Sequence, residues 1–138
     1  MIYVGIDPDV DKNGVAFWNS KTKELELSCE SFFSLFDLLQ SRQVDKVIIE
    51  AGWLNKSNFH LIPGMTKSSA AETGRRVGRN HEAGMKIVEM CEYLKLPNQI
   101  KKPEKSKVNH KKFVWMTKYT GGRTNQEKRD AAMLVYGL

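Results

Sequence analysis

Residues 2–8 read IYVGIDP, a short apolar run that ends at an acid and a proline. An apolar run of this length that stops at a turn predicts a buried strand, here over residues 2–6, with Asp7 following it. Two further extended runs, at 15–19 and Glu24–Glu30, are joined by Ser-Lys-Thr-Lys, a polar connection of hairpin length. The sequence therefore predicts that the chain opens with three antiparallel strands.

The rest of the chain alternates helical patterns with short strands. Ser31 is a candidate N-cap for a helix over Phe32–Ser41, and an apolar strand over 47–50 again ends on an acid, Glu50. Residues 51–79 have no clear period, and we expect a mobile loop or a partly formed helix there. The later elements expected are an amphipathic helix over 80–95, a strand near 99–100, a basic helix over 104–119 and a last helix over 125–136. This order predicts the α/β class, with a mixed five-stranded sheet flanked by helices.

The length and composition predict a single domain over residues 1–138. The chain has 138 residues, of which 41% are hydrophobic and 28% are charged. No apolar run approaches the ~20 residues that span a bilayer, and Met1 leads directly into the first strand without a signal-like segment. We therefore expect a cytoplasmic protein with no membrane partner. Cys29 and Cys91 lack the spacing of metal ligands and are interpreted as small buried residues.

The distribution of charge suggests an anionic partner. The formal net charge is +6, but ten of the 22 Lys and Arg residues and only two of the 16 acids lie between Lys101 and Arg129. A basic segment of this kind suits binding to phosphates. A solvated helix face would explain the same charges about as well.

Four acids stand where they could meet. Asp7 and Glu50 each end an apolar strand, and side chains at the carboxyl ends of strands project into the crevice at the sheet edge. Glu127 and Asp130 are spaced i, i+3, so both lie on one face of the last helix. Clustered carboxylates need a cation, and Mg²⁺ prefers oxygen ligands. Two ions ~3.5–4 Å apart would activate a water and stabilise the leaving oxygen of a phosphodiester. Taken singly, each acid is also explained as a turn former or as a complement to a helix N-terminus.

The first two acids lie in stretches that resemble motifs of the RuvC-type Holliday junction resolvases, a family with the RNase H-like fold. Tyr-Val-Gly-Ile-Asp-Pro at 3–8, followed by Gly14, is similar to the first motif of that family, in which the Asp that ends strand one binds metal. The resemblance assigns this role to Asp7. Ile-Ile-Glu at 48–50 is similar to the second motif, in which a Glu ends the fourth strand and an aromatic three residues later stacks on bases at the junction. Here that aromatic is Trp53.

Two later stretches continue the resemblance in the same order. EKSKVNH at 104–110 is similar to the Lys-Ser-x-Val-x-His stretch, in which the lysine contacts phosphate near the scissile bond, so Lys105 and Lys107 are candidates for that role. EKRDAA at 127–132 is similar to the closing acid-x-x-Asp-Ala helix. The resemblance thus covers nearly the whole chain.

The resemblance implies a metal-dependent endonuclease. A homodimer would cut symmetric strands of a four-way DNA junction with Mg²⁺ or Mn²⁺, two ions in each site held by Asp7, Glu50, Glu127 and Asp130. The chain departs from the family at three places: Asp9 replaces the usual Gly after Asp-Pro, Glu127 replaces an Asp, and residues 56–79 do not match closely. The motifs fit a cellular protein and a phage or mobile-element version alike.

Basic and aromatic residues supply candidates for contacts with DNA. Arg75, Arg76 and Arg79 form a compact basic group that suits phosphate binding, although a solvated surface explains them nearly as well. His110 is a candidate general base or phosphate donor, or simply an exposed hydrogen-bonding residue. Trp53 stands in a polar segment, where stacking on a base explains it better than burial. The full candidate set is Trp53, Lys105, Lys107, His110, Lys111, Arg75, Arg76 and Arg79.

Three other functions compete with junction cleavage. Asp9-Val-Asp-Lys-Asn-Gly14 copies half of a calcium loop, but position twelve is Ser20 where a Glu is required, so we set calcium binding aside. An RNase H-like nuclease that acts on RNA would use the same four acids, and a substrate panel would separate it. A non-catalytic nucleic-acid-binding module is disfavoured because the acidic set is complete.

Overall fold

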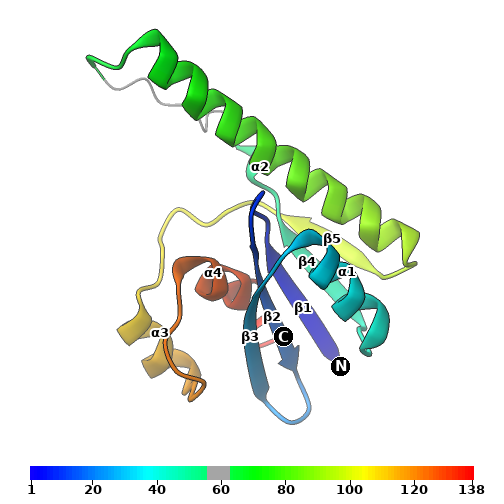
Figure 1. Ribbon diagram of the computed structural model, residues 1–138. Helices are drawn as coiled ribbons and strands as arrows, with labels where there is room; N and C mark the ends of the chain where they lie inside the picture. Colours follow the sequence, from blue (N-terminus) through cyan, green and yellow to red (C-terminus); the bar gives the residue numbers. More distant parts are fainter. Residues whose placement is uncertain (56–62) are drawn as a thin grey trace.

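The five strands form one mixed sheet. The structure, a computed structural model, describes residues 1–55 and 63–138. The strand order is β3-β2-β1-β4-β5. β1 (Ile2–Asp7), β2 (Asn13–Asn19) and β3 (Glu24–Glu30) pair antiparallel, while β4 (Lys46–Glu50) and β5 (Asn98–Lys101) run parallel to β1. The predicted sheet, with its first three strands antiparallel, is confirmed (Figure 1).

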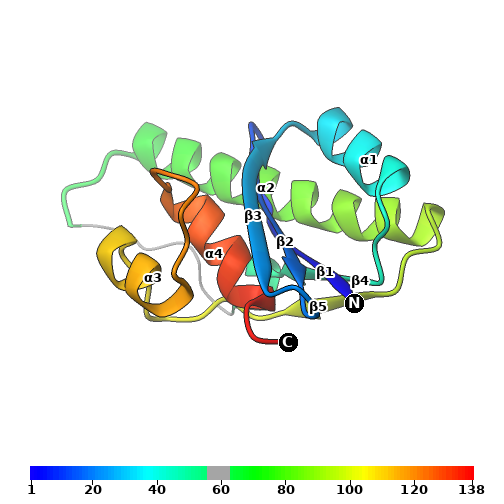
Figure 2. The same cartoon turned by 90° about the horizontal axis from the view of Figure 1, so that it is seen from below.

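Helices cover both faces of this sheet (Figure 2). α1 (Phe32–Ser41) and α2 (Lys67–Tyr93) lie on one face, where Val4 and Ile6 of β1 enter an apolar core. α3 (His110–Thr117) and α4 (Gln126–Val135) lie on the other face, over a second core. Because side chains alternate along a strand, the residues of β1 that flank Val4 and Ile6, including Asp7, belong to the α4 face. No helix among the described residues combines the length and apolar character that crossing a membrane requires.

Two predicted helix starts are confirmed by their caps. Ser31 Oγ accepts the N–H of Ser34 at the start of α1, over the predicted range. The side chain of Asn125 accepts the N–H of Lys128 at the start of α4. Each cap satisfies one of the amide groups that the first turn of a helix leaves without a partner.

The sequence predicted a loop or partial helix over 51–79 and a helix over 80–95. The boundary between these two segments is wrong. A short 3-10 helix occupies Gly52–Leu54, and α2 begins at Lys67, capped by Thr66. Part of the expected loop, residues 56–62, lies outside the described residues. The residues of α2 that are buried begin only at Gly84, so its first half has no apolar period that a sequence pattern could detect.

The basic helix expected over 104–119 is also shorter than predicted. α3 begins at His110, capped by Asn109, and ends before Lys118, which has a left-handed conformation with φ 57°. The helix therefore starts later and ends earlier than expected. The residues before Asn109 run as irregular chain, and this segment carries Lys107 toward the end of β4.

Candidate active site

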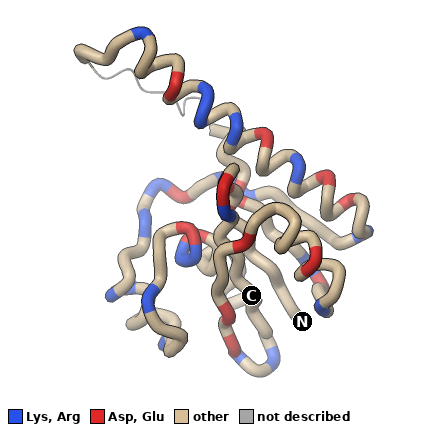
Figure 3. Tube along the Cα trace, in the orientation of Figure 1, with Lys and Arg blue, Asp and Glu red and all other residues tan. Residues whose placement is uncertain are grey.

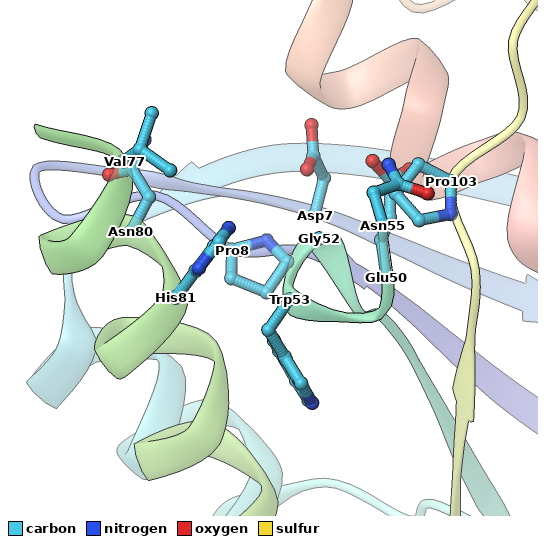
Figure 4. Close-up of a pocket in the computed structure, with 10 residues that line it drawn as sticks. All are labelled: Asp7, Pro8, Glu50, Gly52, Trp53, Asn55, Val77, Asn80, His81 and Pro103. Atoms are coloured by element: carbon cyan, nitrogen blue, oxygen red, sulfur yellow. The ribbon is translucent and has the colours of Figure 1, made fainter. Parts of the chain in front are cut away.

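Asp7 and Glu50 lie at adjacent strand ends. Ile6 of β1 pairs with Ile49 of β4 in parallel register, so the next residue on each strand is Asp7 and Glu50 respectively. Ile48 belongs to the core under α4, and the alternation of side chains puts Glu50 on that same face. Figure 4 shows the two side chains at one end of the sheet, next to the loop that carries Trp53. The predicted juxtaposition of these two strand-end acids is what the register produces.

Two glycines let α4 bring its acids to this end of the sheet. A Cβ at Gly5 would clash with the backbone oxygen of Ala131, and a Cβ at Gly14 would clash with the backbone of Glu127. Gly14 pairs with Asp7 across the first hairpin, so Glu127 lies beside the end of β1. The close approach of helix and sheet at these two points therefore places Glu127 and Asp130 near Asp7.

Burial and the neighbouring acids raise the pKa values of Asp7 and Glu50. Burial, together with the charges of Glu50, Asp130 and Glu127, raises the pKa of Asp7 to about 8, while Lys107 opposes the shift. Burial also raises the pKa of Glu50, again opposed by Lys107. Like charges in a partly desolvated site disfavour ionisation, and a cation relieves that cost.

Lys107 provides a cation inside this acidic cluster. Its Nζ lies 2.7 Å from Asp130 Oδ2 and 3.8 Å from Glu50 Oε1. The two acid side chains are only 11% and 14% exposed, whereas that of Lys107 is 44% exposed. Burial lowers the pKa of Lys107, but the hydrogen bond to Asp130 and the nearby acids outweigh it and raise the pKa overall. The ammonium group thus balances part of the negative charge.

The second oxygen of Asp130 is held by a side-chain network. Gln126 Nε2 donates to Asp130 Oδ1 at 2.7 Å, and Gln126 Oε1 accepts from Arg129 at 3.0 Å. Arg129 also donates to the backbone oxygens of Val108 and Thr124. These bonds fix the orientation of the Gln126 amide, so its NH₂ group faces the Asp130 carboxylate. The network also ties the segment next to Lys107 to α4.

A cavity of about 290 Å³ opens beside Asp7 and Glu50. Its other walls come from the residues that follow β1, β4 and β5 and from α2, whose Asn80 and His81 were not predicted as site residues (Figure 4). The sequence pattern could not place Asn80 and His81 at this cavity, because it did not show that α2 passes the ends of β1 and β4. A second cavity, of about 250 Å³, lies beside Lys107 and Asp130, and Glu50 lines both.

The four acids offer the type of ligand that a hard cation prefers, but their side chains do not surround a common point. The four acids present only carboxylate oxygens, which Mg²⁺ and Mn²⁺ favour. Within 1–55 and 63–138, no three His, Cys, Asp or Glu side chains are close enough together to hold a metal ion. Lys107 lies between two of the acids. Asp9 serves the adjacent turn, where its Oδ1 accepts the N–H of Asp11 at 2.8 Å.

The candidate DNA-binding residues come from four segments: the loop after β4, the first half of α2, the chain before α3 and the start of α3. Trp53 is half-buried, and its indole lies against Gly84 of α2. Packing on α2 therefore explains the position of Trp53, which its polar neighbours in the sequence did not suggest. His110 Nδ1 lies 2.9 Å from Thr124 Oγ1, which joins the start of α3 to the segment before α4. Lys105 and Lys111 are exposed. The remaining candidates, Arg75, Arg76 and Arg79, are exposed on the first half of α2, where Arg75 pairs with Glu72.

Solved structures of RuvC share this fold. RuvC of T. thermophilus in complex with a Holliday junction substrate matches with a TM-score of 0.57 at 12% identity, over 97% of this chain and 90% of that chain. A second Thermus thermophilus RuvC structure matches with a TM-score of 0.55 at 13% identity over the same shares. No family model and no curated protein matches the chain. The chain therefore has the RuvC-like, RNase H-like fold that its motifs predicted.

Proposed function

We propose that this chain is a single nuclease domain, over residues 1–138, that cuts DNA at four-way junctions in a metal-dependent reaction. The observation that carries the proposal is that Asp7, Glu50 and Asp130, from three separate elements, lie near Lys107, with Glu127 beside Asp7. A half-buried group of acids has no structural benefit of its own, because each ionised carboxylate raises the cost of the others. Such an arrangement is typical of sites that bind divalent cations.

The four carboxylates would hold Mg²⁺ or Mn²⁺, two ions in each site. When bound, the ions would activate a water molecule and stabilise the oxygen that leaves the phosphodiester. Asp130 is oriented for this role by Gln126, and Asp7 gains most from a neighbouring cation because its pKa is raised to about 8 without one. Lys107 would then move from Asp130 toward a phosphate oxygen of the scissile strand.

The likeness to a RuvC bound to a Holliday junction supports branched DNA as the substrate class. We assign phosphate contacts to the exposed lysines and arginines of the candidate set, and base stacking to the part of the Trp53 indole that α2 leaves open. A homodimer would let two sites cut opposite strands. The proposed DNA contacts are Trp53, Lys105, Lys107, His110, Lys111, Arg75, Arg76 and Arg79.

Cleavage of a labelled four-way junction tests the proposal directly. Linear duplex and RNA:DNA hybrid serve as substrate controls, with Mg²⁺ or Mn²⁺ or with EDTA. Wild type is compared with Asp7→Asn and with Asp37→Asn, a matched change at an exposed acid of α1. We expect paired symmetric nicks that require the metal, disappear in Asp7→Asn and persist in Asp37→Asn.

Other outcomes would redirect the assignment. Cleavage of the hybrid alone would move it to an RNA-directed nuclease with the same acids. Binding without cleavage under either metal would leave a nucleic-acid-binding module. Single nicks from a protein that sediments as a monomer would overturn the homodimer and keep the chemistry.

A further inference from the structure

Trp115 on α3 is exposed, although the same helix buries Phe113 in the core on the α4 face of the sheet. Its side chain is 72% exposed, whereas Phe113, two residues earlier, is fully buried against α4 and stacks edge-on to Tyr119. Two residues apart on a helix means nearly opposite faces. The helix therefore has its apolar anchor on one side and presents the largest apolar side chain to solvent on the other.

Lysines surround this indole. Lys111 and Lys112 stand four and three residues before Trp115, on the same face of the helix, and the three side chains line a shallow cavity of about 300 Å³. Lys118 Nζ lies 5.8 Å from the centroid of the indole ring. After Glu104 the sequence has no acid until Glu127. Figure 3 accordingly shows basic positions and no acidic position along α3.

This combination favours nucleic acid over protein as the occupant. Protein interfaces are depleted of lysine, whereas an exposed aromatic ring among cations is the usual means of binding a strand with unstacked bases. The ring binds the face of a base, and the lysines bind the phosphates on either side. In a closed duplex the base faces are covered, so the indole requires an unpaired nucleotide.

We infer that α3, whose His110 and Lys111 already stand among the proposed DNA contacts, also carries a second contact, in which Trp115 stacks on an unpaired base while Lys111, Lys112 and Lys118 bind the adjoining phosphates. The inference rests on the proposed function, because a junction whose base pairs open at the branch point presents unpaired nucleotides beside duplex arms. The chain length between Lys107 and Trp115 keeps the two residues within roughly 20 Å. One strand can therefore reach both the acidic cluster and α3.

Binding measurements in EDTA test this contact without cleavage. Fluorescence anisotropy would compare a labelled 15-nucleotide single strand, a junction with unpaired nucleotides at its branch point, and a linear duplex. We expect Trp115→Ala to weaken binding to the first two about tenfold and to the duplex less than about twofold. Trp115→Phe should restore affinity to within about threefold. Phe33→Ala, at an aromatic on α1 that is 77% exposed, is the matched control and should change nothing.

Salt dependence separates the lysines from the ring. For the single strand, Lys111→Gln with Lys112→Gln should reduce the slope of log affinity against log salt by about 0.7 per lysine. Trp115→Ala should leave that slope unchanged, and so should the control Lys95→Gln at the end of α2.

The result that overturns the inference is unchanged single-strand affinity in Trp115→Ala while the wild type binds. If that variant still cleaves junctions, the proposed function stands without the second contact. A change in sedimentation mass with unchanged DNA affinity would assign the indole to a protein contact and also overturn the inference. A wild-type protein that binds none of the three DNAs would remove both proposals.

Discussion

Lys107 Nζ and Asp130 Oδ2 lie 2.7 Å apart within the cluster of acids at the ends of β1 and β4. The pair joins the irregular segment before α3 to α4, and Glu50 at the end of β4 completes it at 3.8 Å. The ammonium group is thus part of the electrostatic balance of the site before any ligand enters. Several measurable properties follow from this balance.

Stability should fall with rising pH when divalent ions are absent. The folded-state pKa of Asp7, about 8, lies above its unfolded value near 3.8, so the native state holds this proton more tightly. The stabilisation is complete below about pH 4 and is lost as pH rises through about 8. The free energy of unfolding should drop by at most about 1.4 kcal/mol per pH unit across that window. Urea unfolding in EDTA at several pH values measures this slope.

Asp7→Asn should remove most of that slope. At pH 8 in EDTA we expect the variant to be about 1–3 kcal/mol more stable than wild type, because a neutral amide replaces a carboxylate that is costly to ionise. Mg²⁺ should raise the melting temperature of wild type and have less effect on the variant. The same pH slope in both proteins would contradict the assignment of the proton to Asp7.

Lys107→Met should destabilise the protein in EDTA by about 1–2 kcal/mol, because Asp130 and Glu50 lose a charged hydrogen-bond partner. Added Mg²⁺ should then stabilise the variant more than it stabilises wild type, since a bound ion replaces the missing positive charge. Thermal unfolding with and without Mg²⁺ gives both values. Lys105→Met, at an exposed lysine of the same segment, is the stability control and should stay within about 0.5 kcal/mol of wild type. Equal Mg²⁺ effects in all three proteins would count against a cation site at Lys107.

Gln126→Leu should reduce junction cleavage about 10–100-fold while the protein stays folded. The amide donates to Asp130 Oδ1 at 2.7 Å and accepts from Arg129 at 3.0 Å, so its loss frees the carboxylate to rotate. The Mg²⁺ concentration for half-maximal rate should rise as well. Gln40→Leu, at an exposed residue of α1, controls for the exchange of side chains. A normal rate in Gln126→Leu would mean that Asp130 needs no such support.

Gly5→Ala should damage both stability and the site. The new Cβ would meet the backbone oxygen of Ala131, so α4 must move away from the sheet with its two acids. We expect a loss of about 2–4 kcal/mol, in the upper range for point substitutions. Gly78→Ala is the control, because nothing lies within 4 Å of the added Cβ and alanine is the better helix former. Urea unfolding should show that variant unchanged or slightly more stable.

Local patterns in the sequence predicted much of the sheet and the positions of the four acids within their strands and helix. Asp7 and Glu50 each follow an apolar strand, and strands of that kind align at one edge in an α/β sheet, so their proximity follows from pattern and topology alone. The i, i+3 spacing of Glu127 and Asp130 likewise requires only a helix. The cap at Ser31 set the start of α1 for the same reason, because a capping bond is local.

The tertiary structure decided what depends on contacts between distant segments. The start of α2 at Lys67 could not be predicted, because the first half of that helix buries no apolar stripe. Trp53 looked unpartnered because its packing surface, Gly84, lies on a helix 31 residues further along. Local sequence patterns were sufficient to show which acids stand at strand ends and on one helix face. Only the close approach of α4 over Gly5 and Gly14, and the irregular chain that carries Lys107, decided that these charges meet, because electrostatic interaction depends on distance in space and not on separation along the chain.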